Sequence, residues 1–529
     1  MLKSRKWRPI ALSVFCILLL SAAVFLFCLL KLNILPMEYL IPIIAVIVLF
    51  VCLIGVLLFY RMRKKRSRAR RIRRIIGVAL SGVFTVAFLF GAVVLNRIDE
   101  TKSAVAVQPN TAPQAVVGVY VRQNDAAVAL SDTAAYRYAV LAGLEMEKFN
   151  ANYAISKINE NLGAPVEAYS YDSVTGAADA LLNGDVQALA VSGACLSFLE
   201  EIEGYESFAG QIRLIDEISV PQSATLDSTP VLVEVTSEPV PTPTPEPTPE
   251  PTPEPIKYGE DTPLVFYLSG MDTSGQEIVY NTRADVNILM AVNPTTKQVL
   301  LISSPRDTFI TKFGDKLTHC GRWGVNKSIE ALEFLYSTHV DNYCRINFTG
   351  FKELVDLIGG ITVDNPKTFD TDPDNGGHHF EEGIIELDGY EALCYARERH
   401  AFADGDLARG RNQVRVLTAV LNKAKSDSST ILLNYSSILD TLAGTFETDL
   451  TSDQISDLVK VALKNINDWD IRSYSMWGTS GMRTLATTGS QTVAIIWPNA
   501  KSVEFASQLL EMITSGELIT DEVMATAPR

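Results

Sequence analysis

The chain has 529 residues, of which 47% are hydrophobic, and its formal net charge is −15 at pH 7. This length allows two or three domains, each with its own core. The acidic balance excludes a general binder of polyanions such as nucleic acid.

Three apolar stretches begin the chain, at residues 11–30, 39–60 and 75–95. Each has about 20 residues, the length that a helix needs to cross a hydrocarbon core of roughly 30 Å. We therefore predict a membrane anchor with three transmembrane helices over residues 1–100. A cleaved signal peptide is the alternative for the first stretch, but the apolar core of such a peptide has only roughly 7 to 15 residues.

Basic residues are concentrated at two places in this anchor. Residues 1–100 hold 16 Lys and Arg against 3 Asp and Glu, and most of these cations lie at positions 3–8 and 61–74. Basic loops stay in the cytoplasm, so we expect a cytoplasmic N-terminus and an extracytoplasmic chain after about residue 97. A nucleic-acid-binding patch is the alternative for residues 61–74. Between two membrane spans, however, basic residues more often fix the orientation of the helices and bind anionic lipid head groups.

Residues 104–237 alternate short apolar runs with helical patterns, which predicts a small extracytoplasmic α/β accessory domain. Residues 136–155 have helical periodicity. Residues 172–193 predict a capped helix, then a turn at 183–185 and a strand at 186–191. Nothing in this domain indicates catalysis.

A proline-rich segment follows at residues 238–255, "EPVPTPTPEPTPEPTPEP". Proline at nearly every second position favours an extended linker, which at about 3.1 Å per residue reaches close to 50 Å. A proline-rich recognition motif is the alternative.

The last predicted domain, residues 257–529, mixes strands with helices of ordinary length. Buried strands are expected at 264–268, 286–292 and 298–303, and helices at 326–335, at 348–358 and from Asp388, with Glu391 completing a capping box. Such mixing predicts an α/β sandwich.

Charged residues lie where these three strands begin or end. Asp272 follows the first strand, Arg283 and Asp285 precede the second, and Arg306 and Asp307 follow the third. Ordinary surface ion pairs are the alternative for any one of them, since such pairs are common and weak.

Four further arginines lie close together in "CYARERHAFADGDLARGRNQ", at positions 397, 399, 409 and 411. Arg presents a rigid fork of donors, so a cluster indicates an anionic ligand or a set of ion pairs. With two carboxylates for Mg²⁺ and several arginines, the strand ends and this segment together predict a metal-assisted pyrophosphate site.

Six segments resemble the LytR-CpsA-Psr family, in this order and at similar spacings. They are GMD, RAD, SSPRD, NFTGFKELVDLIGGI, LDGYEALCYARER and GDLARGRNQ, within about residues 257–424. The resemblance implies an α/β/α sandwich with a deep apolar pocket for a lipid tail. It also implies a phosphotransferase that moves a glycopolymer from a polyprenyl-pyrophosphate carrier to peptidoglycan through a phosphodiester, in assembly of the cell wall or capsule.

The same resemblance implies roles for eight residues. Asp272 and Asp285 match Mg²⁺ ligands. The pyrophosphate-binding set is Arg283, Arg306, Arg397, Arg399, Arg409 and Gln413, of which Arg283 and Arg306, with Asp285, are also the expected catalytic residues. The general base stays unassigned, because a metal-bound Asp285 is a poor base and Asp307 is equally able to hold Arg306 in place.

Two other functions remain open from the residues. One is hydrolysis of the same lipid pyrophosphate, with water as the acceptor. The other is a non-catalytic scaffold or regulator that binds wall polymer. Regulation through DNA is disfavoured, because the arginine cluster is expected outside the membrane and no helix-turn-helix pattern is evident.

The four clustered arginines are not expected to be equivalent. If the residues around Arg397 and Arg399 are extended, those two side chains share a face. Asp406 is expected to cap a new helix, with Arg409 and Gln413 four apart on one face near its positive end. Arg411 then points roughly 200° away from Arg409, at about 100° per residue.

Residues 370–381 have carboxylates at calcium-loop offsets, but Asn375 replaces the required Gly and Pro373 intrudes. A solvated insertion is predicted there instead. A disulfide among Cys320, Cys344 and Cys394 is permitted outside the cell, with no pairing assigned.

Overall fold

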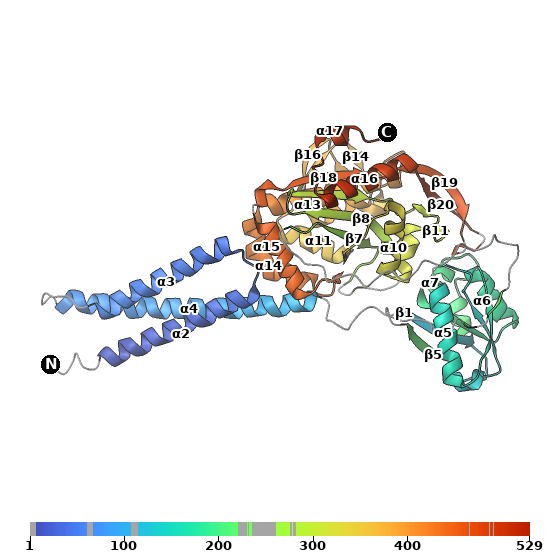
Figure 1. The fold of residues 1–529 in the computed structure, drawn as a ribbon, viewed down its shortest axis with the longest axis horizontal. Coiled ribbons are helices and arrows are strands. Elements are labelled where there is room, and N and C mark those ends of the chain that lie inside the picture. Colours follow the sequence, from blue (N-terminus) through green and yellow to red (C-terminus); the bar gives the residue numbers. More distant parts are fainter. Residues whose placement is uncertain are drawn as a thin grey trace.

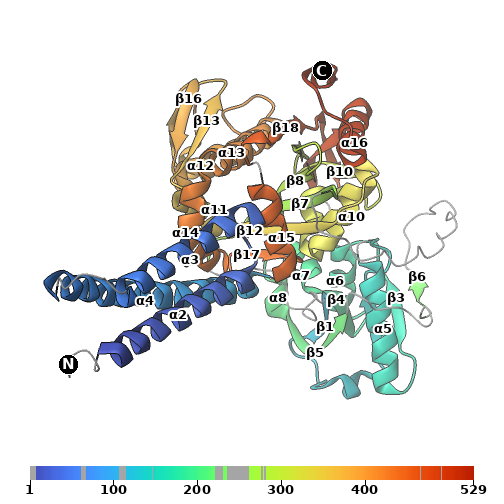
Figure 2. The ribbon, with the colours of Figure 1, turned by 60° about the vertical axis from the view of Figure 1, so that its left-hand side comes forward.

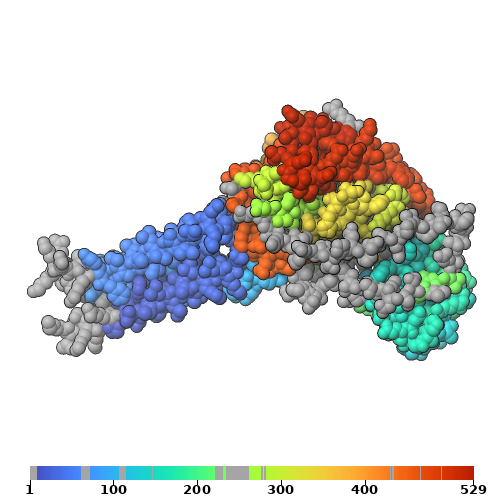
Figure 3. All heavy atoms as spheres, in the orientation of Figure 1, coloured from blue at the N-terminus to red at the C-terminus, as the bar shows by residue number. Residues whose placement is uncertain are grey.

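The computed structural model describes residues 7–60, 67–106, 115–145, 147–220, 230, 232–234, 261–275, 278, 282–464, 466–485, 487–489 and 491–528. Figure 1 shows a rod of N-terminal helices, a small α/β unit and a large α/β unit. We call the last two the accessory unit (residues 115–234) and the large unit (residues 261–528). The rod projects from one side of the molecule (Figure 3). The predicted linker at 238–255 lies outside the described residues.

The rod consists of α2 (Trp7–Leu32), α3 (Met37–Phe59) and α4 (Ser67–Val105). Their apolar segments have 24, 23 and 34 residues, enough to cross a membrane. Phenylalanine pairs pack between them, with the ring centroids of Phe25 and Phe88 5.6 Å apart. The three predicted apolar helices are therefore confirmed, and the side of the membrane on which each end lies stays a prediction.

The accessory unit contains a six-stranded sheet in the order β5-β1-β4-β2-β3-β6. Its strands are β1 (Ala115–Arg122), β2 (Arg137–Val140), β3 (Glu167–Ser170), β4 (Ala188–Ser192), β5 (Ile212–Val220) and β6 (Val233–Glu234). Its helices are η1 (Leu130–Thr133), α5 (Lys148–Leu162), α6 (Val174–Asn183), α7 (Gly193–Leu199) and α8 (Phe208–Gln211). The predicted capped helix is confirmed, since Ser173 caps α6 and the left-handed Gly184 ends it.

The helix expected over residues 136–155 is wrong in its first part. Residues 137–140 form β2, which lies in the sheet between β3 and β4. Tyr138 and Val140 pack into the core on the α5 side, while Ala139 packs into the core on the α6 side. A strand covered on both faces is continuously apolar, so it lacks the alternation that marks a half-buried strand.

The large unit is built on a mixed sheet in the order β17-β12-β7-β8-β9-β18. The strands are β7 (Leu264–Met271), β8 (Ala284–Asn293), β9 (Gln298–Ser303), β12 (Asn342–Asn347), β17 (Phe446–Thr448) and β18 (Asp470–Ser475). On one face lie α10 (Val325–Tyr336) and α16 (Ala500–Ser515); toward the other lie α11 (Phe348–Leu357), α12 (Gly389–Arg397), α13 (Asp406–Ser426) and α14 (Ser428–Leu442). Figure 2 shows β7 and β8 between these two groups of helices.

Smaller elements complete the large unit. They are β10 (Phe309–Ile310), β11 (Asp315–Lys316), α9 (Leu317–Cys320), η2 (Gly321–Trp323), β13 (Ile361–Asn365), β14 (Phe369–Asp370), η3 (Pro373–Asn375), β15 (His379–Phe380), β16 (Gly383–Leu387), α15 (Ser452–Leu463), η4 (Ile466–Asp468), β19 (Gly478–Thr484), β20 (Thr492–Pro498) and α17 (Asp521–Ala525). All seven cysteines are free thiols.

The two faces of β9 show how the layers form. Leu300 and Ile302 pack into the core with α10 and α16, whereas Leu301 packs with Val414 of α13. Both faces of this strand are thus covered by helices, which confirms the expected α/β/α sandwich. The expected strands and helices of this unit are present, and Asp388 with Glu391 forms the predicted capping box of α12.

The polar end of α4 contacts the large unit directly. Arg97 Nη2 lies 3.1 Å from Asp440 Oδ2, and Thr101 Oγ1 donates to Asp440 Oδ1 at 3.1 Å. The next residue, Lys102, donates from Nζ to Ser456 Oγ of α15 at 2.9 Å. The helix that is expected to leave the membrane therefore holds α14 and α15 of the large unit.

Candidate functional site

The three strand ends that carry charges meet at one edge of the large sheet. β7 and β8 are antiparallel, with Met271 opposite Ala284, and β8 and β9 are antiparallel, with Ile288 opposite Ser303. The end of β7, the start of β8 and the end of β9 are consequently neighbours. This register brings Asp272, Asp285 and Arg306 together although up to 34 positions separate them in the sequence.

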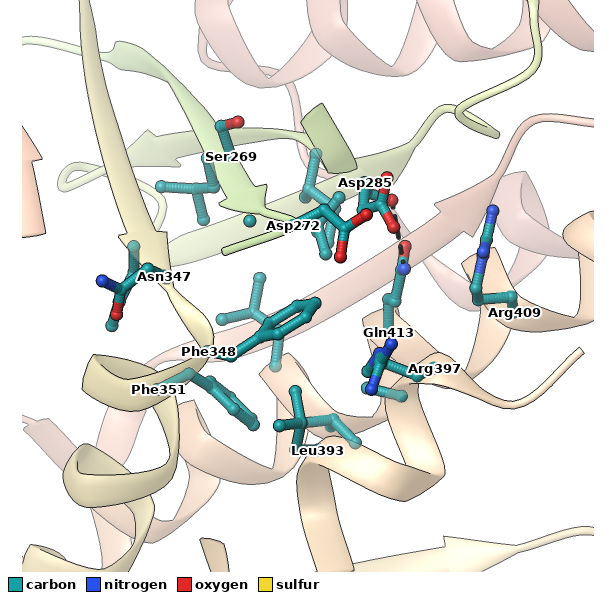
Figure 4. A pocket seen from close by; sticks show the side chains of 18 of the residues that line it. Ser269, Asp272, Asp285, Asn347, Phe348, Phe351, Leu393, Arg397, Arg409 and Gln413 are labelled. Atoms are coloured by element: carbon teal, nitrogen blue, oxygen red, sulfur yellow. Dashed lines mark hydrogen bonds between the residues drawn. The ribbon is translucent and has the colours of Figure 1, made fainter. Parts of the chain in front are cut away.

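A cavity of about 670 Å³ opens at this edge. Its lining includes all eight residues for which a role was expected: Asp272, Arg283, Asp285, Arg306, Arg397, Arg399, Arg409 and Gln413. Figure 4 shows Asp272, Asp285, Arg397, Arg409 and Gln413 gathered at the polar end of the cavity. The structure therefore brings the predicted set together, and the role of each member remains a prediction.

The other part of the cavity is apolar. Phe348 and Phe351 of α11 and Leu393 of α12 line it in Figure 4. Further side chains from the strands, α11, α13 and α14 add to this wall, among them Leu268, Ile288, Leu354, Val416, Val420 and Leu442. A cavity with one charged and one apolar end suits a ligand with an anionic head and a hydrocarbon tail.

Arg306 and Asp285 form the central ion pair of the charged end. Arg306 Nη1 lies 2.5 Å from Asp285 Oδ1, and each side chain is 14% exposed. Burial disfavours the Arg306 cation, but the charges of Asp285, Asp307 and Asp406 outweigh it and raise its pKa. Arg306 therefore stays protonated and holds one oxygen of Asp285.

Asp307 lies behind Arg306 and pairs with Lys316 Nζ at 2.9 Å. Burial alone raises the pKa of Asp307, but Lys316 and Arg306 outweigh it and hold that pKa below its ordinary value. Asp307 is absent from the cavity lining among the residues described. Its contacts suit a residue that positions Arg306, and the general base stays unassigned.

The start of α13 differs from the expectation that Asp406 caps it. The helix begins at Asp406 itself, and the residue before it, Gly405, has φ 46°. The Asp406 carboxylate pairs with Arg409 and accepts a hydrogen bond from the Asp307 backbone N–H. Gln413 is on the same face of the helix and donates from Nε2 to the Asp285 carbonyl at 3.3 Å.

Arg397 and Arg399 are placed differently from each other. Arg397 is the last residue of α12, so the expectation of an extended chain there is wrong; the extended conformation begins at Glu398. The Arg397 guanidinium lies 4.6 Å from the Phe348 ring centroid, and Arg399 Nε donates to His400 Nε2 at 3.0 Å. The first therefore lies where the apolar and charged ends of the cavity meet.

Arg411 lies on the other side of α13. It pairs with Asp404 at 2.5 Å and is 42% exposed, and it is absent from the cavity lining within the described chain. This position confirms the expected difference between Arg411 and Arg409.

One part of the cavity wall was not predicted from the sequence. Asp372, Asp374 and Asn375 line the cavity. Most of residues 370–381 are exposed, as expected for a solvated insertion, but these three also border the site. Glu398, only 1% exposed, holds this loop by accepting from the Asp372 N–H at 2.8 Å and from Asn375 Nδ2 at 3.1 Å. The sequence feature that could have indicated this contact is Glu398, which lies between two arginines in "RER" and needs a hydrogen-bond partner when it is buried.

The carboxylates of Asp272 and Asp285 fit a magnesium ion. They line the same end of the cavity (Figure 4) and offer hard oxygen ligands. One Asp285 oxygen remains beside the one that Arg306 holds, and no ion pair of Asp272 occurs within the described residues. No cluster of three or more metal-ligating side chains occurs in that part of the chain. Mg²⁺ is usually bound by only one or two carboxylates, with substrate phosphate and water as its other ligands.

Comparisons with known proteins agree with the motifs. The model of the LytR_cpsA_psr family matches residues 243–499. The chain is 33% identical over 212 residues to a protein of Oceanobacillus iheyensis, covering 38% of this chain and 63% of that one, and 36% identical over 206 residues to one of Enterococcus faecalis, covering 38% and 65%. It is 33% identical over 223 residues to a Bacillus anthracis protein, covering 41% and 71%.

All three relatives are named polyisoprenyl-teichoic acid–peptidoglycan teichoic acid transferase TagU. The chain thus spans less than two thirds of the length of the first two. Among solved structures it is similar to "TagT bound to LIIa-WTA", at 26% identity and a TM-score of 0.40, covering 50% of this chain and 94% of that one. Together, the family model and the Bacillus anthracis relative show that the chain belongs to the LytR-CpsA-Psr family.

Proposed function

We propose that the protein is a membrane-anchored phosphotransferase. It takes a glycopolymer from a polyprenyl-pyrophosphate carrier and joins it to peptidoglycan through a phosphodiester. The observation that carries this proposal is a cavity with a charged, arginine-rich end and an apolar end. The three relatives named as teichoic acid transferases support the same reaction class.

The arginines of the charged end suit a pyrophosphate. Arg306 and Arg409 are 86% and 93% shielded from solvent at their side chains, where charge-assisted hydrogen bonds are strong. Phosphoryl transfer passes through a loose transition state, so the protein mainly positions the reactants and neutralises charge. Fixed guanidinium groups accomplish both.

Magnesium, held by Asp272 and Asp285, would add charge neutralisation at the phosphate oxygens when bound. The acceptor hydroxyl oxygen forms a bond to the phosphorus nearest the glycan, while the bond from that phosphorus to the bridging oxygen breaks. Polyprenyl phosphate leaves with the bonding electrons. The acceptor hydroxyl loses its proton to a general base.

The contact between α4 and α14 supports entry of the lipid from the membrane. Asp440 of α14 binds Arg97 and Thr101 of α4, while Leu442 of the same helix lines the apolar end of the cavity. An anchor that holds this helix keeps the apolar end close to the bilayer. The basic segments at 3–8 and 61–74 support an extracytoplasmic large unit.

A transfer assay tests this function against its alternatives. Full-length protein in nanodiscs receives a polyprenyl-pyrophosphate glycan, Mg²⁺ and peptidoglycan oligomers. Glycan on the oligomer supports the proposal. Free polyprenyl phosphate with no glycan on the oligomer identifies a hydrolase, and carrier binding without turnover identifies a scaffold.

A further inference from the structure

The accessory and large units meet at a specific aromatic contact. In Figures 1 and 2, α7 lies on the side of the accessory unit that faces the large unit. The ring of Phe198 lies 4.9 Å from the ring of Trp323 and 4.8 Å from that of His319, measured between centroids. The Arg322 guanidinium lies 4.5 Å from the Phe198 centroid. One accessory side chain is therefore enclosed by three residues of the large unit.

Partly buried hydrogen bonds accompany this aromatic contact. Trp323 Nε1 donates to Glu147 Oε2 of the accessory unit at 2.7 Å, and Glu147 is fully buried. Arg322 Nη1 donates to Ser197 Oγ at 2.8 Å. Buried polar groups that find their partners across an interface define one relative position of the two units.

In this docked position Glu201 reaches the candidate site. Its two carboxylate oxygens pair with two arginines of the large unit, Oε2 with Arg283 and Oε1 with Arg322. Arg283 is one of the arginines that line the cavity. A carboxylate of the accessory unit thus binds a guanidinium that is expected to bind the substrate.

Arg283 keeps a further donor that Glu201 does not use. Its Nε atom is buried and has no hydrogen-bond partner among the described residues. A carboxylate and a phosphate oxygen both bind guanidinium through the same N–H fork. Because Glu201 and a phosphate are both negative, they also repel each other when they share one arginine.

We propose that Glu201 competes with the substrate's phosphate for Arg283, so that the docked accessory unit lowers the anion affinity of the site. The inference rests on the proposed function, since it takes the anion to be the pyrophosphate of the carrier. It gives the accessory unit a regulatory role: any event that moves Glu201 away from Arg283 strengthens substrate binding.

The test measures binding of inorganic pyrophosphate to the full-length protein in detergent, by calorimetry at constant Mg²⁺ and low salt. Glu201→Gln removes the competing charge and keeps the size of the side chain. We expect the dissociation constant to fall about three- to tenfold, the size expected for one partly exposed neighbouring charge. Glu203→Gln is the matched control, because this exposed residue of the same loop has no ion pair in the described chain.

A double-mutant comparison separates direct competition from a general charge effect. In an Arg283→Ala background, Glu201→Gln should no longer tighten pyrophosphate binding. Unchanged or weaker binding by Glu201→Gln in the otherwise natural chain overturns the inference, as does an equal gain in Glu203→Gln or in the Arg283→Ala background. Failure of glycopolymer transfer would appear separately, in the transfer assay, because pyrophosphate binding does not require an acceptor.

Discussion

Arg409 and Arg411 lie two residues apart on α13, yet they occupy opposite sides of it. Arg409 lines the cavity and is 6% exposed, whereas Arg411 pairs with Asp404 outside the cavity. Arg409→Ala should therefore lower the transfer rate by about a hundredfold, as removal of one preorganised donor does. Arg411→Ala, the matched control, should stay within about twofold, since exposed pairs contribute little. Equal losses in the two variants would contradict this assignment.

Arg306 provides a test of geometry rather than charge alone. Arg306→Lys keeps the positive charge but loses the planar fork that binds both Asp285 and a phosphate oxygen. We expect the rate of transfer to fall at least about tenfold with Lys and about a hundredfold with Ala. If Arg306→Ala transferred glycopolymer at the natural rate, Arg306 would have no role in the reaction.

The ion pairs of Asp307 should make the stability of the fold depend on pH in the acidic range. Its folded pKa lies below the ordinary value of 3.8, so its pairing stabilises the fold above that pH and is lost as the pH falls through the folded pKa. Asp307→Asn should cost about 3 kcal/mol at pH 7 by leaving Lys316 buried without its carboxylate. Thermal unfolding between pH 7 and 3 checks this: the difference between natural and variant protein should shrink below about pH 4.

A substitution at the apolar end of the cavity should weaken binding of the lipid tail without weakening binding of the pyrophosphate head group. Val420 lines it, so Val420→Asp places a charge where the hydrocarbon tail is expected. Affinity for a polyprenyl pyrophosphate should fall at least about tenfold, whereas affinity for inorganic pyrophosphate should change less than about twofold. Val128→Asp, at a position 76% exposed in the accessory unit, is the control for the same substitution. Similar losses for both ligands would argue against a tail in this cavity.

The contact between α4 and the large unit predicts a dependence on the bilayer. Asp440→Ala removes the acceptor of both Arg97 and Thr101. In nanodiscs, transfer from a long-chain carrier should become slower. With a short-chain, water-soluble carrier the rate should be unchanged, since Asp440 is absent from the cavity lining in the described chain. A loss with both carriers would indicate damage to the site itself.

The sequence predicted the large unit well because its signals are local. Capping residues such as Asp388 and the charges at strand ends are readable from short spacings. The strand at 137–140 was missed because a central strand, covered on both faces, has no alternation to separate it from a helix.

The candidate site likewise combines residues that the sequence predicted with contacts that it could not predict. Its eight expected residues converge on one cavity, whereas the contact of Glu201 with Arg283 joins positions 82 residues apart in different units. No spacing rule connects such positions, because their neighbourhood depends on how Phe198 and Trp323 dock the two units. Asp372 was likewise missed because Glu398, distant by 26 positions, holds its loop at the cavity.

Following the phosphorus atom tests the central proposal most directly. A polyprenyl-pyrophosphate glycan is prepared with ³²P only at the phosphorus attached to the glycan, and is given to the full-length protein in nanodiscs with Mg²⁺ and peptidoglycan oligomers. Phosphodiester transfer predicts that label and glycan reach the oligomer together, at equal molar amounts, while unlabelled polyprenyl phosphate is released. Glycan on the oligomer without label, or label found only in free glycan phosphate, would contradict it.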